Sequence, residues 1–267
     1  TLDRSSAASD VYKRQPLGPC ATAAARAALI ARVDALMDGA APRDGMFFQH
    51  DAPTGAYDDL PVGRGWIGPS RAYRKIEGVE RDPVVRAWIE NSLFARVARA
   101  TIGAEVVLGR AVVWTKAAAG AAPGGTELPW HQDGGNFWGL SAQPTVTLWT
   151  ALDDAPIASG CVELIPGSHH GGLATPAGGT IPAALTDARP AVTVPAAAGD
   201  VVLLHNLVWH RSRRNHTAQP RRALSIVLMP ASTRQRSCGS TSHRILTQAP
   251  DRRRRPTAPC ACTARRC

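Results

Sequence analysis

The sequence predicts an α+β fold whose core is a β-barrel or a double-sheet jelly roll, with N-terminal helices packed on one sheet. Two observations lead to this prediction. Up to residue 103 apolar residues recur at helical spacing, whereas after residue 104 the chain changes to short segments rich in Val, Leu, Thr and Trp, separated by Gly, Pro and Asp. A helical beginning followed by many short strands is typical of an α+β protein with a sandwich or barrel core.

The helical part begins with an alanine-rich segment at residues 21–39. Its apolar side chains recur every three or four residues, which predicts an amphipathic helix that ends at Gly39. Charged residues interrupt the segment, so it does not have the apolar core of a secretory signal. The apolar positions are Leu29, Val33, Leu36 and Met37.

Residues 51–70 are rich in Gly and Pro and predict a loop. Asp82 followed by Pro83 predicts the start of a helix, because Asp accepts hydrogen bonds from free backbone N–H groups and Pro suits the first helical position. The apolar spacing that follows predicts two helices, the second of which stops at Gly103.

Six later segments alternate or concentrate apolar residues over seven to twelve positions between turn residues, and each predicts a strand. Their number and short length favour a barrel or a double-sheet jelly roll. The segments are 105–116, 145–152, 160–168, 188–194, 199–210 and 221–229.

The length of 267 residues suits one domain, which we place at residues 16–231. The net charge of +10 lies mostly in the tail, residues 232–267, whose nine Arg and one Asp carry +8. The tail has almost no apolar periodicity, so we expect it to be disordered or an out-of-frame reading of the DNA. The leader, residues 1–15, is expected to be non-native or disordered, since it resembles translated adapter sequence.

Composition argues against several classes of function. Because the basic excess lies in the tail, the rest of the chain does not predict a nucleic-acid partner. No run of about 18 apolar residues predicts a membrane span. The body keeps two cysteines, Cys20 and Cys161, without a secretory signal, which favours a cytoplasmic protein.

The stretch LPWHQDGGNF, residues 128–137, contains a candidate metal site. Residues two apart in a strand point to the same side, so His131 and Asp133 can present an imidazole and a carboxylate to one ion. His210, at the end of an apolar predicted strand, is the candidate third ligand. Two imidazoles and one carboxylate form the facial triad of non-haem Fe(II) oxygenases, which leaves three positions on the metal open.

Two other histidines, His205 and His216, compete with His210, and a single histidine in a β-rich core is more often a packing residue. The segment after His210 strengthens the metal interpretation. Arg221 opens the next predicted strand and could hold a carboxylate in a bidentate pair near the metal. Ser212 could add a hydroxyl donor. The combined pattern is much rarer by chance than any of its parts.

With these residues in place, the sequence resembles the phytanoyl-CoA dioxygenase family of Fe(II)/2-oxoglutarate-dependent oxygenases. The resemblance covers roughly residues 73–230, and its most specific parts are the GCVELIPGSH block and the spacing from His210 to Arg221. The segments that carry it are VVWTK, PWHQD, TLWTALDDAPIASGCVELIPGSHHGGL, GDVVLLHNLVWHRS and RRALSIVL.

The resemblance implies a double-stranded β-helix, a cupin-like form of the jelly roll. It also implies that His131, Asp133 and His210 hold Fe(II). Arg221 with Ser212 would bind the distal carboxylate of the cosubstrate 2-oxoglutarate, while the 2-oxo acid end chelates the iron.

Two further residues match positions that line the cosubstrate pocket in this family, Lys116 and Trp149. Each has a plainer interpretation: Lys116 could be a solvated strand end, and Trp149 could be ordinary core. Arg222 is expected to face the other way across its strand.

The activity implied is hydroxylation of an aliphatic carbon of a small organic substrate, with O2 consumed and succinate and CO2 released. Related halogenases replace the carboxylate ligand with a small residue, whereas this chain has Asp133, so hydroxylation is favoured.

Three alternatives remain open at this point. The chain could be a catalytically silent jelly roll that binds a small molecule, or a zinc-dependent hydrolase, because two histidines and a carboxylate also suit catalytic zinc. The third, a basic nucleic-acid module, requires a genuine tail. The sequence leaves open the primary substrate, which could be an acyl-CoA, an amino-acid derivative or a secondary metabolite, and it does not predict the oligomeric state.

Overall fold

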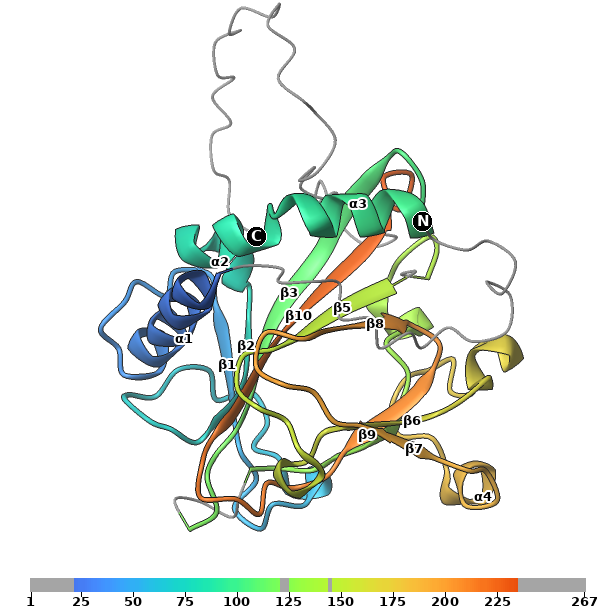
Figure 1. The fold of residues 1–267 in the computed structure, drawn as a ribbon. Coiled ribbons are helices and arrows are strands. Elements are labelled where there is room, and N and C mark those ends of the chain that lie inside the picture. Colours follow the sequence, from blue (N-terminus) through green and yellow to red (C-terminus); the bar gives the residue numbers. More distant parts are fainter. Residues whose placement is uncertain (1–21, 121–124, 144–145, 235–267) are drawn as a thin grey trace, which may run out of the picture.

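The computed structural model describes residues 22–120, 125–143 and 146–234, which form two antiparallel sheets with helices at their margins (Figure 1). The larger sheet has six strands in the order β1-β2-β3-β10-β5-β8, and the smaller has four in the order β4-β9-β6-β7. This is the predicted α+β fold with a jelly-roll core. The leader, Cys20 and tail residues 235–267 lie outside the described residues, so the domain boundaries at 16 and 231 stay a prediction.

The strands have the following bounds. The larger sheet contains β1 (Phe47–His50), β2 (Tyr73–Glu77), β3 (Val106–Lys116), β10 (Arg221–Pro230), β5 (Val146–Ala151) and β8 (Val201–His205). The smaller contains β4 (Leu128–His131), β9 (Trp209–Ser212), β6 (Val162–Ile165) and β7 (Val192–Val194).

Within the described ranges, four α-helices accompany the sheets: α1 (Ala23–Met37), α2 (Pro83–Ile89), α3 (Ser92–Thr101) and the short α4 (Ala183–Thr186). Single 3-10 turns occur at Tyr57–Asp59, Val79–Arg81, Asn136–Trp138, Ile157–Ser159 and Ser168–Gly171. In the described part of the chain, none of these helices combines the length and apolar character needed to cross a membrane.

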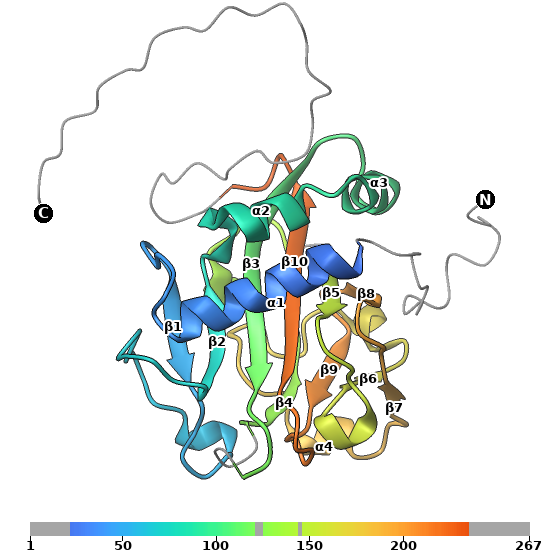
Figure 2. The same cartoon turned by 60° about the vertical axis from the view of Figure 1, so that its left-hand side comes forward.

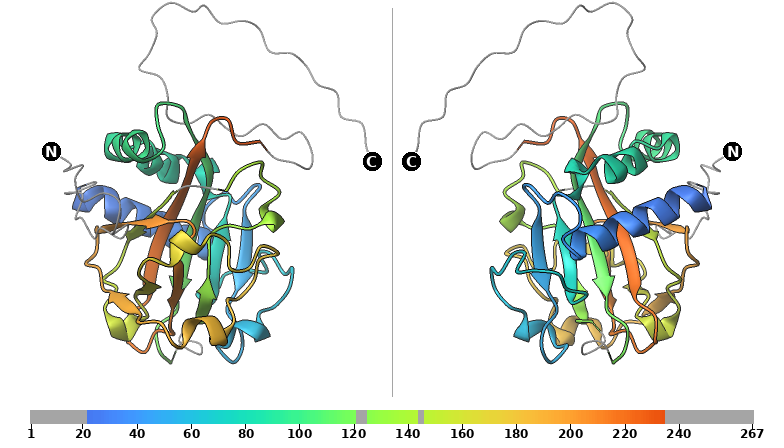
Figure 3. Two further views of the ribbon diagram at one scale, coloured as in Figure 1. Left: turned by 90° about the vertical axis from the view of Figure 1, so that its right-hand side faces the viewer. Right: turned by 90° about the vertical axis from the view of Figure 1, so that its left-hand side faces the viewer.

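Helix α1 lies across the outer face of the larger sheet, over β2, β3 and β10 (Figure 2). Figure 3 shows the same arrangement from both sides, with α1 in front of the sheet in one view and behind it in the other. Each fully buried Leu or Val in this interface contributes roughly 1.5–3 kcal/mol. The interface contains Leu29, Val33, Leu36 and Met37 from α1 and Ile76, Val113, Leu148, Leu224 and Ile226 from the sheet.

The predicted helix start at residues 82–83 is confirmed. The Asp82 carboxylate accepts hydrogen bonds from the backbone N–H groups of Val84 and Val85, and Pro83 occupies the first turn. Asn91 caps α3 in the same way, which separates the two helices. The first helix ends at Met37, just before Gly39 with its positive φ of 79°.

The predicted strand at 199–210 is wrong as a single element. The chain turns at Asn206, where the Val208 backbone N–H donates to the His205 carbonyl at 2.9 Å, and the two halves join different sheets as β8 and β9. An Asn inside an apolar run is a turn signal, because its side chain hydrogen-bonds nearby backbone. Because of this turn, β8 lies at the edge of the larger sheet, and His210 lies on β9 in the smaller sheet.

Strands β1 and β2 were not predicted. They pair with each other and extend the larger sheet beyond β3, with Phe47 opposite Glu77 and Lys75 opposite Trp114. Charged and polar residues alternate with apolar ones only briefly in these segments, so their strand signal is weak. The extension forms one wall of the pocket described below.

Candidate metal centre

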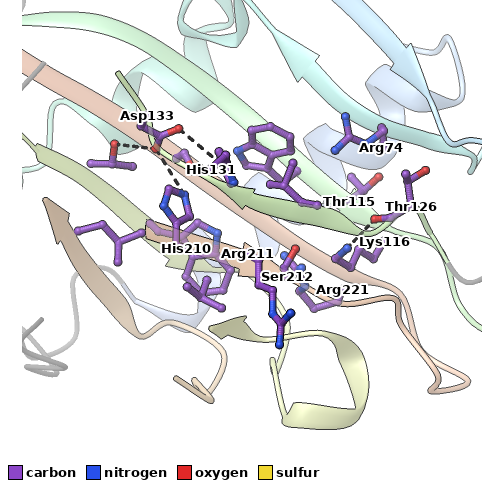
Figure 4. A pocket seen from close by; sticks show the side chains of 17 residues that line it. Arg74, Thr115, Lys116, Thr126, His131, Asp133, His210, Arg211, Ser212 and Arg221 are labelled. Carbon is purple, nitrogen blue, oxygen red and sulfur yellow. Dashed lines mark hydrogen bonds and ion pairs between the residues drawn. The ribbon is translucent and has the colours of Figure 1, made fainter. Parts of the chain in front are cut away.

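Three predicted ligands come together at one end of the space between the sheets (Figure 4). His131, the last residue of β4, and His210 of β9 are direct cross-strand partners. The Asp133 carboxylate lies 3.9 Å from His131 Nε2 and 3.8 Å from His210 Nε2. One ligand atom from each residue lies within 4.8 Å of the others, so a single ion can contact all three.

Backbone carbonyls set the orientation of both imidazoles. His131 Nδ1 is 2.9 Å from the Pro129 carbonyl oxygen, and His210 Nδ1 is 3.0 Å from that of Val208. When Nδ1–H donates to a carbonyl, Nε2 keeps the free lone pair that a metal requires. Both Nε2 atoms therefore face the Asp133 carboxylate as ligand atoms.

The sequence spacing suggested that His131 and Asp133 lie on one strand, but the structure places Asp133 outside it. Strand β4 ends at His131, and Asp133 follows in a bend. The turn between β8 and β9 holds it there: the Asp133 backbone N–H donates to the Asn206 carbonyl at 2.8 Å, and Asn206 Nδ2 donates back to the Asp133 carbonyl at 3.2 Å. The Thr147 hydroxyl lies 3.5 Å from the Asp133 carboxylate.

The electrostatics favour ligand protonation states that bind metal. Burial and the neighbouring His210 lower the pKa of His131 to about 4, so its imidazole is neutral at physiological pH. Burial opposes ionisation of Asp133, but His210 and His131 outweigh it and hold the pKa of this carboxyl below its usual value. A neutral imidazole and an ionised carboxylate are the forms that coordinate divalent ions.

The competing histidines lie elsewhere. His205 Nδ1 accepts a hydrogen bond from the Leu207 N–H at 3.1 Å, and its ring packs 4.9 Å from that of His169. His216 is exposed. Among the described residues, the only group of three or more His, Cys, Asp or Glu side chains close enough to share an ion is His131, Asp133 and His210.

The pocket that contains the metal ligands also contains the predicted carboxylate site. Arg221 and Ser212 both line it and are buried. Arg221 Nη2 donates to the Gly160 carbonyl at 2.9 Å, while its Nε has no hydrogen-bond partner. Gly160 is required where the chain passes the backbone of Arg213, since it has φ +72° and a Cβ there would lie 2.1 Å from the Arg213 carbonyl oxygen.

No described carboxylate forms an ion pair with Arg221. Burial lowers the pKa of its guanidinium to about 10. A buried guanidinium without an acid partner is costly unless a ligand supplies the negative charge. The site therefore fits the distal carboxylate of a small dicarboxylic acid. The metal ligands at the other end fit its chelating end.

Lys116 and Trp149 line the same pocket. Lys116 lies directly opposite Arg221 in the register of β3 and β10, and its Nζ donates to the Thr126 carbonyl at 2.6 Å. It is buried rather than solvated, and burial with the charge of Arg221 lowers its pKa well below the ordinary value. The Arg221 guanidinium lies 5.7 Å from the centre of the Trp149 ring.

Sequence reasoning missed several pocket residues. Asn206 and Thr147 support Asp133, and the interruption of an apolar strand by Asn206 could have revealed that role. Arg74 and Trp114 line the pocket from β2 and β3. No sequence signal pointed to Arg74, because the strand that carries it was not predicted.

Known proteins resemble this chain in sequence and in fold. The family model for phytanoyl-CoA dioxygenase matches residues 66–223. Phytanoyl-CoA dioxygenase domain-containing protein 1 of Bos taurus is 34% identical over an alignment of 119 residues that covers 40% of this chain and 41% of the relative. The chain thus spans about two fifths of the length of this relative.

Solved structures share the fold. AviO1 from Streptomyces viridochromogenes Tue57 matches with a TM-score of 0.60 and 26% identity, over 88% of this chain and 98% of that one. The epimerase SnoN, in complex with Fe3+, alpha ketoglutarate and nogalamycin RO, matches with a TM-score of 0.63 and 20% identity, over 88% and 90% of the two chains. A family match over more than half of the sequence, together with this fold and metal-ligand set, shows that the chain belongs to the phytanoyl-CoA dioxygenase family.

Proposed function

We propose that the chain is an Fe(II)- and 2-oxoglutarate-dependent dioxygenase that hydroxylates an aliphatic carbon of a small organic substrate and releases succinate and CO2. One observation carries the proposal. A single pocket has a three-ligand metal set at one end and, at the other, a buried arginine without a described acid partner. These two features match the two ends of 2-oxoglutarate.

His131, Asp133 and His210 would hold the iron. Their backbone contacts orient the two imidazoles before metal binds, so little rearrangement is required. Three protein ligands on one face of an octahedral ion leave three positions for small molecules.

Arg221 and Ser212 would bind the distal carboxylate of 2-oxoglutarate. The guanidinium can offer two parallel N–H donors to a carboxylate, and such charge-assisted pairs are the strongest hydrogen bonds in proteins. Trp149 would form a wall of this part of the pocket, and the Lys116 amino group would lie opposite Arg221.

Fe(II) with 2-oxoglutarate supplies the capacity to activate O2 and oxidise an unactivated C–H bond, and the protein contributes binding and orientation. Asp133 favours hydroxylation over halogenation, because its carboxylate occupies the position that a halide would need. The walls of the pocket include the apolar side chains of Trp114, Leu128, Val162 and Leu204.

Adding Fe(II) and 2-oxoglutarate to the full chain without oxygen tests the proposal. We expect the visible charge-transfer band of the chelate, and we expect Arg221→Ala to weaken it at a fixed cosubstrate concentration. No band in a folded protein that still binds metal would contradict the proposal and favour a zinc site or a silent binding fold.

A further inference from the structure

Arg74 is a second buried arginine in the same pocket, and neither the metal centre nor the proposed 2-oxoglutarate site uses it. It lies on β2, is 5% exposed and borders the pocket together with Trp114 and Thr115. Figure 4 places it on the opposite side of the pocket from Arg221 and Ser212. It therefore presents a separate cationic group to the same enclosed space.

The Arg74 guanidinium is held in place but not neutralised by an ion pair. Its Nη1 donates to Gln49 Oε1 at 2.7 Å, and its Cζ lies 5.6 Å from the Tyr57 ring centre and 5.5 Å from that of Trp114. Among the described residues no carboxylate forms an ion pair with it. These contacts orient the guanidinium while leaving donors for a ligand.

The Asp51 carboxylate acts electrostatically on both Arg74 and Lys116 and favours the protonated form of each. One of its carboxylate oxygens accepts from the Thr126 backbone N–H and hydroxyl, at 2.7 and 2.8 Å. This end of the pocket thus has two buried basic side chains, Arg74 and Lys116, and one buried acid, Asp51. Burial lowers the pKa of Arg74, as expected for a charge that lacks full compensation.

2-Oxoglutarate would not remove this excess. Its distal carboxylate is accounted for by Arg221, its other carboxylate by the metal, and Asp133 is a metal ligand. A buried cation left over in a substrate pocket is stabilised when the substrate brings a negative charge. Arg74 is suited to a carboxylate, because its planar fork matches the geometry of that group.

We propose that Arg74 anchors the carboxylate of the primary substrate, so that the substrate is a free organic acid with an apolar body that lies along Trp114 and Leu128. The inference rests on the proposed function for the identity of the reaction, but the binding itself does not. A guanidinium that is 5% exposed is reached by a compact carboxylate more readily than by a bulky thioester.

Calorimetry on the full chain tests the binding. The probes are two acids, phenylacetate and hexanoate, and their neutral methyl esters, titrated into the metal-free protein and into the anaerobic protein loaded with Fe(II) and 2-oxoglutarate. We expect at least one acid to bind in both states and its ester to bind about tenfold or more weakly, the loss expected when a buried charged group has no partner.

Arg74→Gln should weaken the acid about tenfold or more and leave the ester and the 2-oxoglutarate chelate unchanged. Arg74→Lys keeps the charge without the fork and should be intermediate. Arg99→Gln makes the same charge change at an exposed position on α3 and is the matched control. The melting temperature of Arg74→Gln should not fall, whereas a purely structural arginine would be needed for stability.

Failure of both acids to bind, equal affinity for acid and ester, or unchanged acid affinity in Arg74→Gln would each overturn the proposal. Loss of 2-oxoglutarate binding in Arg74→Gln would also overturn it and assign Arg74 to the cosubstrate. If Arg74→Gln does not fold, the acid-to-ester comparison on the unaltered chain and Arg74→Lys decide. If an acid binds but Fe(II) and 2-oxoglutarate form no chelate, the proposed reaction is rejected and the binding role of Arg74 stands.

Discussion

Arg221 and Arg222 are neighbours on β10, yet they lie on opposite faces of the larger sheet in opposite electrostatic settings. On the outer face, Arg222 Nε and Nη2 donate to Asp153 at 2.7 and 2.9 Å, and its Nη1 donates to Asp34 at 2.8 Å. Inside, Arg221 Nη2 donates to the Gly160 carbonyl at 2.9 Å. The outer guanidinium is therefore paired with two carboxylates, and the inner one has no carboxylate partner in the part of the chain that the structure describes.

The difference separates charges that hold the fold from charges that await a ligand. Burial opposes the charge on Arg222, but Asp153 and Asp34 outweigh it and raise its pKa, whereas burial lowers the pKa of Arg221. A paired arginine links α1 to the sheet, and an unpaired one keeps its donors available. Arg74 resembles Arg221 in this respect, because it forms no ion pair with a described carboxylate.

Replacing Asp133 by Ala is expected to have the largest effect. Loss of one of the three proposed metal ligands should reduce succinate formation more than about 100-fold. Even changes to residues that only hydrogen-bond to metal ligands reduce metal affinity or activity about 10- to 100-fold. The measurement is 2-oxoglutarate turnover with and without added Fe(II). Full turnover in a folded Asp133→Ala protein would remove Asp133 from the ligand set.

The two neighbouring arginines provide the direct test of the comparison. Arg221→Ala should weaken 2-oxoglutarate binding by about 100-fold, because the bidentate charged pair with the ligand is lost. It should cost little stability, because this pair is absent from the ligand-free protein. Arg222→Ala should leave that affinity unchanged and lower the free energy of unfolding by about 2 kcal/mol, since its ion pairs are partly exposed. The chelate titration and urea unfolding measure the two effects, and an exchange of these results would reverse our assignment.

Asn206→Ala should have an intermediate effect. It removes the amide that donates to the Asp133 carbonyl and accepts from Thr147, so the metal ligand loses its support while remaining present. We expect metal affinity to fall about tenfold, measured by competition with a chelating dye. Asn215→Ala, which alters a loop contact away from the metal ligands, is the control and should retain the original affinity.

The smallest effect concerns a paired acid on β6. Burial opposes ionisation of Glu163, but Arg213 and Arg211 outweigh it and lower its pKa below the ordinary value of 4.5. Its stabilisation is therefore present above pH 4.5 and is lost as the pH falls through the lowered pKa. Glu163→Gln should cost about 1 kcal/mol at pH 7, because one partner is exposed.

Urea unfolding of both proteins from pH 7 downward measures this difference, which should shrink in acid. A difference that stays constant across the whole range would mean that Glu163 contributes through packing rather than charge.

Much of the site was predictable because its chemistry lies in short local patterns. The Asp82–Pro83 pair starts a helix through contacts within one turn, and HQD places two donor groups near each other on any extended or bent backbone. The burial of Lys116 was not predictable, since it depends on Arg221 and Thr126 from other segments. The break of the predicted strand at Asn206 depended on which sheet each half joins.

By itself the sequence determined the fold class, through the change from helical to strand periodicity, and the donor groups, through the identities of His131, Asp133, His210 and Arg221. Only the tertiary structure decided which charges find partners. Arg222 forms ion pairs with acids from α1 and from the chain after β5, whereas Arg74 and Arg221 form none with the carboxylates that the structure describes. The reason is physical: pairing depends on side chains that are distant in sequence, and their meeting is a property of the packed sheets.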